Sequence, residues 1–170
     1  MDTKDIYERC NQLIEELSRF DASMTEIGPA IKDHRLREFE KQIGFELPLD
    51  LKYFLTVNNG VSLMGVEILG LDEVNQGQSL NEVYQFEHFE VDNKMPMHYL
   101  PISPDGMGNH YCLDLPKLEN GLCPVVFWQH DYEYASLDEV ETCNPNFMEW
   151  VQEVVIDWTL MDYNYDGSEK

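Results

Sequence analysis

The segment GFELPLDLKYFLTVNNG, residues 44–60, constrains the fold most, because it marks both ends of one short helix. Gly44 is a typical helix-ending residue, and Pro48 suits the start of the next helix, where its missing N–H would have no partner. The final residues NNG, which end at Gly60, predict a left-handed exit. The polar side chains of this helix include no pair of nucleophile and base. We therefore predict that the segment leads the chain from helices into a sheet and carries no chemistry.

Two longer helices are predicted before this segment. Residues 3–20 place apolar side chains at alternating steps of four and three, which is the spacing of one helical face, and Thr3 is a suitable cap. Residues 31–43 also place their apolar side chains on one side, and Gly44 ends that helix. A short loop connects the two helices.

Strand signals follow the third helix. Residues 61–71 are rich in β-branched and apolar side chains with interruptions at Gly65 and Gly70, which predicts two strands or one strand with a bulge. The polar connection of residues 72–98 has room for one short helix. Residues 98–115 show two extended runs around a turn rich in Pro, Asp and Gly, and this is the clearest hairpin signal in the chain.

A second hairpin is predicted within residues 121–137. The apolar run from Val125 to Trp128 is its first strand, and a run carrying Tyr132 and Tyr134 is its second. If one face of this hairpin is buried, alternate side chains must point to solvent.

A helix is predicted to close the domain. Asn144 is its expected cap, Pro145 takes the first helical position, and Trp158 belongs to an apolar face that extends to about residue 161. Residues 162–170 are expected to form a loose acidic tail.

The order of these elements indicates the α+β class, because helices come first, mostly antiparallel strands follow, and a helix closes the chain. A chain of 170 residues is expected to form one domain. We predict a single domain over residues 1–161, in which N-terminal helices and a C-terminal helix pack against a twisted, mostly antiparallel sheet.

The charge of the chain is strongly negative and unevenly distributed. The sequence has 33 acidic and 11 basic residues, a formal net charge of -22. Residues 53–170 alone hold 21 acidic and 3 basic residues, which gives -18. Such a surface repels nucleic acid and attracts a basic protein. The alternative is that the acidic surface only keeps the protein in solution.

Catalytic and metal-binding patterns are missing from the sequence. The five histidines lie in different predicted elements without paired spacing, and the sequence has neither a GxSxG motif nor a phosphate-binding loop. We expect no enzyme activity, no metal and no cofactor. One alternative stays open, in which His110, Asp114, Trp128 and Tyr99 converge on a pocket for a small ligand.

Two further features favour a cytoplasmic protein. No apolar run approaches the roughly 18 residues of a membrane span, and the N-terminus lacks the features of a signal peptide. The four cysteines are separated by 102, 11 and 20 positions, which matches no zinc or redox spacing. We expect reduced and mostly buried thiols.

A candidate partner-binding surface lies in the second predicted hairpin. Exposed tyrosines among carboxylates are typical of a surface that binds a basic protein, since aromatic side chains anchor and charges steer. Trp128 is predicted to lie in the core, whereas the two tyrosines either contact a partner or flank the closing helix. The predicted partner-binding residues are Asp105, Asp131, Tyr132, Glu133, Tyr134, Glu139 and Glu141.

Four sequence stretches in a fixed order resemble the SUKH superfamily, in its branch related to the yeast cell-wall regulator of the Smi and Knr type. They are LREFEKQIGFELPLDLKYFLTVNNG, EILGLDEV, YLPISPDGMGNHYCLDL and PVVFWQHD. The resemblance covers residues 30–132 as the family core, with residues 1–28 before it and a closing helix at 144–161. The residues that match its structural motifs are Leu47, Pro48, Asn59, Gly60, Gly70, Pro101, Asp105, Gly108, Asp114 and Trp128. Val61 departs from the pattern, where a second glycine is frequent.

This resemblance implies a single α+β domain with helices against a twisted sheet. In bacteria it implies an immunity protein that neutralises a cognate polymorphic toxin, and such toxins are often nucleases. The eukaryotic branch instead implies a regulatory scaffold or adaptor, so family membership alone does not decide the function. We expect an immunity protein that binds a basic toxin domain.

Overall fold

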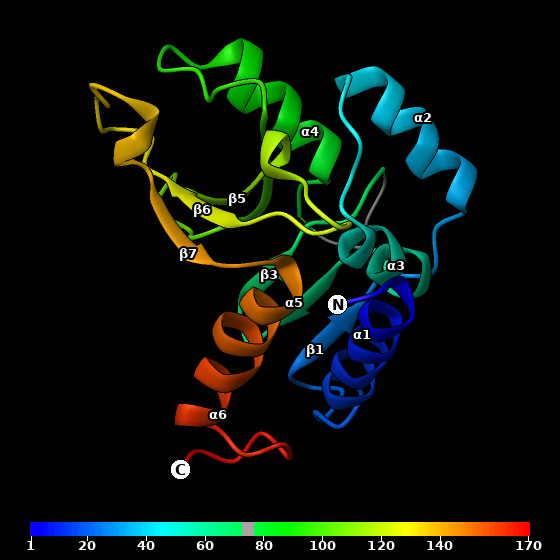
Figure 1. Cartoon of the computed structure of the whole chain (residues 1–170). Helices are drawn as coiled ribbons and strands as arrows, with labels where there is room; N and C mark the ends of the chain where they lie inside the picture. The colour runs from blue at the N-terminus through cyan, green and yellow to red at the C-terminus, as the bar shows by residue number, and fades with distance from the viewer. Residues whose placement is uncertain (73–76) are drawn as a thin grey trace.

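The computed structural model describes residues 1–72 and 77–170 (Figure 1). The predicted connection of residues 72–98 and the predicted family stretch EILGLDEV therefore lie partly outside the described residues. The chain starts with α1 (Thr3–Leu17), β1 (Thr25–Ile27), α2 (Asp33–Ile43) and α3 (Leu49–Val57). It continues with β2 (Val61–Leu63), β3 (Val66–Ile68), α4 (Leu80–Gln85), the π-helical turn η1 (Phe86–Glu90), β4 (Tyr99–Pro104) and β5 (His110–Asp114).

The last third of the chain completes the fold. It comprises the 3-10 turn η2 (Leu115–Lys117), β6 (Val125–Trp128), the 3-10 turn η3 (Leu137–Glu139), β7 (Glu141–Asn144), α5 (Phe147–Trp150), the π-helical segment η4 (Val151–Asp157) and α6 (Trp158–Asp162). The last three segments follow one another without interruption and form the closing helix, residues 147–162.

The strands form two antiparallel sheets rather than the one predicted. The first sheet has the order β1-β2-β3, and the second has the order β4-β5-β6-β7. A backbone hydrogen bond of 2.8 Å from Leu69 N to Ile102 O connects the end of β3 to β4. Figure 1 shows α4 beside the second sheet at one end of the molecule, and α6 near the opposite end. The predicted α+β class is confirmed.

Several predicted turns and helix ends agree with the structure. Gly44 ends α2 in the left-handed conformation, with φ of 77°. Met64 and Gly65 both have positive φ and join β2 to β3, so the predicted interruption separates two strands. Gly60 has φ of 93°, as predicted for the exit from α3, whereas Asn58 is extended.

The second predicted hairpin is wrong in its second strand. Residues 132–134 form no strand, and β6 pairs instead with β7, where Phe127 lies opposite Glu141. The residues between β6 and β7, 129–140, form a loop with one 3-10 turn. Tyr132 and Tyr134, which the sequence placed on a strand, therefore lie in a loop.

Two predicted helix caps are displaced. The first helix is capped by the Asp2 side chain, which accepts a hydrogen bond from Asp5 N, and Thr3 is already helical. The closing helix is capped by Asn146, which accepts from Glu149 N at 2.9 Å. Asn144 ends β7 instead, so the predicted cap lies two residues too early.

The end of the chain also differs from the prediction. Trp158, predicted on the apolar face, is 48% exposed. Residues 162–170, predicted as a loose tail, fold back onto the first helix. There the Tyr165 hydroxyl donates to Glu16 of α1 at 2.7 Å, its ring lies tilted 4.7 Å from the Phe20 ring, and its carbonyl accepts from Asp21 N at 2.8 Å.

Two clusters of buried side chains hold the fold together. The larger cluster joins the helices α1, α2, α3 and α4, the first sheet, the closing helix and the inner side of the second sheet. The smaller cluster lies within the second sheet and comprises Met95, Tyr99, Cys112, Val126, Trp128 and Val140. Three of the four cysteines are buried, as predicted, and Cys143 is half-buried. No helix among residues 1–72 and 77–170 combines the length and the apolar character that crossing a membrane requires.

Candidate partner-binding surface

The β6–β7 loop, residues 129–140, carries most of the predicted partner-binding residues. Trp128, at the end of β6, is buried, and the Tyr134 ring lies 5.0 Å from it. The Tyr132 ring lies 4.7 Å from that of Tyr134 and is 47% exposed. The three rings therefore lead from the interior to the solvent. Gln129 N donates to the Tyr134 hydroxyl at 3.1 Å, which holds the loop close to this stack.

Two neighbouring loops hold the β6–β7 loop in place. Asn109, in the β4–β5 hairpin, accepts hydrogen bonds at its Oδ1 from the backbone N of His130, and the same atom lies 3.0 Å from His130 Nδ1. Asn93, after η1, donates to the carbonyls of His130 at 2.8 Å and Tyr132 at 3.4 Å. A side chain on Gly108 would lie 2.7 Å from the His130 ring, so this contact requires glycine. The β6–β7 loop is therefore pre-organised by its contacts with the β4–β5 hairpin and with the loop after η1.

Asp105 has a structural role in the β4–β5 turn. Its carboxylate accepts hydrogen bonds from Met107 N at 2.7 Å, Asn109 N at 3.0 Å and Asn109 Nδ2 at 2.8 Å. Partial desolvation opposes its ionisation, but these hydrogen bonds outweigh that effect and lower its pKa. Asp105 is exposed, yet its oxygens already have three donors, so its first role is to shape the turn that holds His130.

Among the remaining acidic residues of the predicted set, Glu139 accepts a hydrogen bond from Ala135 N at 3.1 Å within the β6–β7 loop. All of them are exposed: Asp131, Glu133, Glu139 and Glu141. Between Lys117 and Lys170 the sequence contains 12 acidic residues and no lysine or arginine. A partner that approaches this loop therefore meets a negative field with few compensating charges nearby in sequence.

The predicted small-ligand residues lie in the interior beneath this loop. His110, Asp114, Trp128 and Tyr99 are each at most 6% exposed. Burial lowers the pKa of His110 to about 4, so the ring is neutral at pH 7, and its Nδ1 lies 3.9 Å from Glu87 Oε1. Burial also raises the pKa of Glu87. Asp114 forms an ion pair with Lys117 at 2.9 Å. These groups pack as part of the structure, and we do not retain the ligand-pocket alternative.

Asn59 connects the end of α3 to the end of β3. Its side chain donates to Leu71 O and accepts from Leu71 N, each at 2.8 Å, so both backbone groups of Leu71 are satisfied. Gly60 follows, and a side chain there would lie 3.1 Å from the backbone N of Gly70. The other motif residues also lie at element ends or in strands: Leu47 and Pro48 before α3, Gly70 after β3, Pro101 in β4 and Asp114 at the end of β5.

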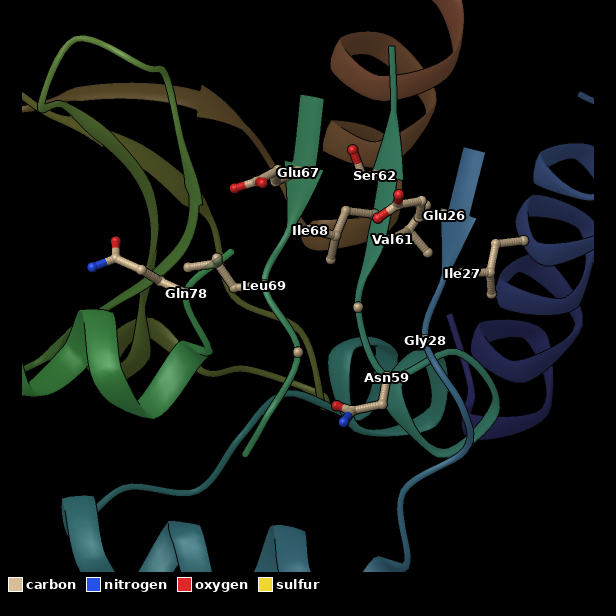
Figure 2. A pocket seen from close by; sticks show the side chains of 12 residues that line it. Glu26, Ile27, Gly28, Asn59, Val61, Ser62, Glu67, Ile68, Leu69 and Gln78 are labelled. Carbon is tan, nitrogen blue, oxygen red and sulfur yellow. The ribbon is translucent and has the colours of Figure 1, made fainter. Parts of the chain in front are cut away.

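A small hollow lies on the first sheet beside Asn59 (Figure 2). Figure 2 shows Glu26, Ser62 and Glu67 on neighbouring strands at its edge, where Ser62 pairs in register with both glutamates. The hollow has a volume of about 40 Å³. This is room for water and is far below the roughly 300 Å³ at which small-molecule sites begin. The fold therefore offers a surface, and not this hollow, as its candidate site.

The comparisons with known proteins agree with the geometry. The family model SUKH_5, described as SMI1-KNR4 cell-wall, matches residues 10–156. The chain belongs to this SUKH family. A solved structure described as the crystal structure of protein from Pseudomonas syringae pv. tomato is similar, with a TM-score of 0.55 and 21% sequence identity. The match covers 86% of this chain and 96% of that chain, and at this identity it shows a shared fold alone.

Membership of the SUKH family confirms the resemblance seen in the sequence. It supports a role of the immunity-protein or SMI1-KNR4 kind, which acts through binding to another protein. The individual contact residues stay a prediction. The structure places Asp131 to Tyr134 together on one loop and Glu139 and Glu141 at its far end, with Asp105 in the adjoining turn.

Sequence reasoning allowed one short helix within residues 72–98 but missed the exposed aromatic pair on it, which borders this surface. Phe86 and Phe89 are exposed on the outer side of η1, next to the loop of Asn93. The weak helical pattern in the sequence rests on Leu80, Val83, Tyr84 and Glu87, which are all buried. A helical projection of the same residues would have shown that Phe86 and Phe89 lie on the side opposite the buried face.

Proposed function

We propose that this SUKH-family protein is an immunity protein that binds and neutralises a cognate toxin domain. The proposed toxin domain is basic, with a nuclease as the leading candidate. The acidic β6–β7 loop covers its active site by shape and charge. The observation that carries this proposal is the exposed acidic loop of residues 129–140. The loop is anchored by a row of three aromatic rings, Trp128, Tyr134 and Tyr132. Binding needs no catalytic residue, metal or cofactor.

The charge of the partner follows from its substrate. A nuclease must present a cationic groove to the phosphates of nucleic acid, and an acidic protein is attracted by the same field. Such steering raises association rates to about 10⁸ to 10⁹ M⁻¹s⁻¹ at low salt. Inhibition takes place in the cytoplasm, where the nucleic acid that the toxin would cleave is found.

A second candidate function is supported by the description of the matched family, which names the cell wall. In that case the protein is a regulatory scaffold or adaptor, and the acidic surface recruits a basic partner without inhibiting it. A gene neighbour that encodes a large protein with a variable C-terminal domain favours immunity over this alternative.

Co-expression tests the proposal directly. The toxin domain encoded beside this gene is expressed in bacteria with and without the SUKH protein, and growth and co-purification are measured. Rescue of growth together with a co-purified pair supports immunity. If both proteins are folded and expressed but neither result is seen, immunity against that neighbour is rejected and the adaptor function gains support.

A further inference from the structure

The outer face of α4 and η1 exposes two large aromatic side chains. Phe86 is 45% exposed and Phe89 is 51% exposed, and they lie three residues apart in one helical segment. Residues at this spacing are neighbours on a helix surface. Large apolar side chains gain stability when they leave water, so an adjacent exposed pair is a feature of interaction sites more than of a neutral surface.

The phenylalanines cannot turn toward the interior, because the inner face of the helix is already filled. Val83, Tyr84 and His88 are buried there. His88 contacts two carbonyl oxygens, with Nδ1 at 2.7 Å from Tyr84 O and Nε2 at 3.0 Å from Pro96 O. The contact with Tyr84 O lies within the helix, whereas the contact with Pro96 O ties the inner face to the chain that follows, and Phe86 and Phe89 remain on the solvent side.

Acidic residues surround the aromatic pair. Glu82 and Glu90 are exposed on the same helical segment, and the exposed Asp92 lies two residues after its end. The sequence has no lysine or arginine between Lys52 and Lys94. An occupant of this face must therefore offer apolar side chains at its centre and positive charges around them. A segment of a basic protein that also carries an aliphatic or aromatic side chain meets both conditions.

The helix face is continuous with the β6–β7 loop. Asn93 lies three residues after Glu90 and donates hydrogen bonds to the carbonyls of His130 and Tyr132. On the inner side, Glu87 of η1 faces His110 of β5. Figure 1 shows α4 and the β6–β7 loop at the same end of the molecule, away from α6. The exposed Tyr132 and the two phenylalanines thus belong to one end of the protein.

From this arrangement we infer that Phe86 and Phe89 are apolar anchors for the basic partner, and that the outer face of α4 and η1 extends the binding surface beyond the acidic loop. The inference rests on the proposed function and adds a division of roles to it. The acidic loop attracts the partner and sets the association rate, whereas the aromatic pair retains the bound partner and sets the dissociation rate.

The test measures association and dissociation rates for a catalytically inactivated toxin domain encoded beside this gene. We compare the unmodified protein with the double variant Phe86→Ala/Phe89→Ala. The control is Trp158→Ala, because Trp158 is 48% exposed on the opposite end of the molecule. The double variant should dissociate at least roughly tenfold faster, with a nearly unchanged association rate and salt dependence. The control should bind like the unmodified protein.

A conservative variant separates anchoring from any change of the helix. Phe86→Leu/Phe89→Leu keeps apolar area and should recover much of the binding, while the melting temperatures of all variants stay close to that of the unmodified protein. Dissociation within about twofold of the unmodified rate for the alanine double variant, or an equal effect of Trp158→Ala, overturns the inference and leaves the proposed function intact. If the unmodified protein itself fails to bind, the proposed function is contradicted and the inference falls with it.

Discussion

The two buried clusters of this protein differ in composition and in what they support. The larger cluster consists mostly of aliphatic and aromatic side chains from the helices and from both sheets. The smaller one combines two sulfur-containing residues with Tyr99 and Trp128, and it lies directly beneath the β6–β7 loop. The buried, neutral His110 lies nearby. The larger cluster maintains the fold, whereas the smaller one positions the surface that is proposed to bind a partner. Stability and surface geometry should therefore be separable by mutation.

The largest loss of stability is expected in the larger cluster. Phe147→Ala removes a fully buried ring that lies 5.4 Å from the Phe54 ring and 6.1 Å from the Trp150 ring. The loss of buried area and the cavity left behind should lower the free energy of unfolding by about 3 to 5 kcal/mol. Urea unfolding followed by tryptophan fluorescence measures this change. A loss below about 1 kcal/mol would show that this cluster does not dominate stability.

A buried carboxylate whose ionisation opposes folding, that of Asp50, lies beside the larger cluster. Asp50 lies at the start of α3, accepts from Leu51 N at 2.9 Å and Met148 N at 3.4 Å, and is fully buried. Burial raises its pKa from an ordinary value near 4 to about 7, although these backbone N–H groups partly compensate. Because the folded-state pKa lies above the unfolded one, the contribution of Asp50 to stability is greatest below pH 4 and is lost as the pH rises toward 7.

The magnitude of this pH effect follows from the pKa difference. At pH 8 the loss is on the order of 3 to 4 kcal/mol relative to the protonated state. Asp50→Asn carries no charge at either pH and should abolish this part of the pH dependence. Urea unfolding of both proteins at pH 5 and pH 8 measures it. If the two proteins lose the same free energy between pH 5 and pH 8, Asp50 is not responsible.

A smaller loss is expected for Asn59→Ala, which breaks the connection between α3 and β3. The change leaves Leu71 N and Leu71 O without their side-chain partner in a buried place. The expected cost is about 2 to 3 kcal/mol. The neighbouring Asn58→Ala is the control, since its backbone N donates to Phe54 O and its backbone O accepts from Gly60 N, and these contacts survive the change. Equal losses in both variants would contradict the assigned role of the Asn59 amide.

The smaller cluster should respond locally. Tyr134→Phe removes only the hydroxyl that accepts from Gln129 N at 3.1 Å and keeps the ring against Trp128. Global stability should fall by about 1 kcal/mol or less. Hydrogen exchange at the Gln129 amide should become faster than in the unmodified protein, while amides of α3 keep their protection. Unchanged exchange at Gln129 would mean that this hydrogen bond does not hold the loop.

The sequence predicted those parts of the fold that depend on local pattern. The apolar stripes of the helices and the turn glycines Gly44 and Gly65 lie where they were expected. β1 was missed because a run of three residues is too short to show an alternation of apolar and polar side chains. It is recognised as a strand only through its pairing with β2. The alternating tyrosines indicated a strand, but in the structure the Tyr134 ring packs against Trp128 and the Tyr132 ring packs against Tyr134 within a loop.

Long-range pairing explains the other differences. β7 has weak strand propensity at Glu141 and Asn144, and it forms because β6 offers a free edge. Asn144 was the predicted cap because it precedes Pro145, but it pairs with Val125 in the sheet, and the second asparagine, Asn146, becomes the cap. The acidic character of the candidate surface could be predicted from composition. The two exposed phenylalanines of η1 were overlooked, although their positions on the helical projection are a sequence signal that could have identified them.

The central claim is that the acidic β6–β7 loop attracts a basic partner. Asp131→Lys/Glu133→Lys changes two exposed residues and should alter the free energy of unfolding by less than about 0.5 kcal/mol. The control Glu8→Lys/Glu15→Lys makes the same change in net charge on the exposed face of α1.

The decisive measurement is the association rate of both variants with the inactivated toxin domain at low and at physiological salt. We predict association roughly tenfold slower than for the unmodified protein when the loop is reversed, an effect that shrinks as salt is added, and less than about a threefold change for the α1 control. Equal slowing in both variants would mean that only net charge matters. An unchanged rate for the loop variant would contradict the account, because the partner would then bind elsewhere.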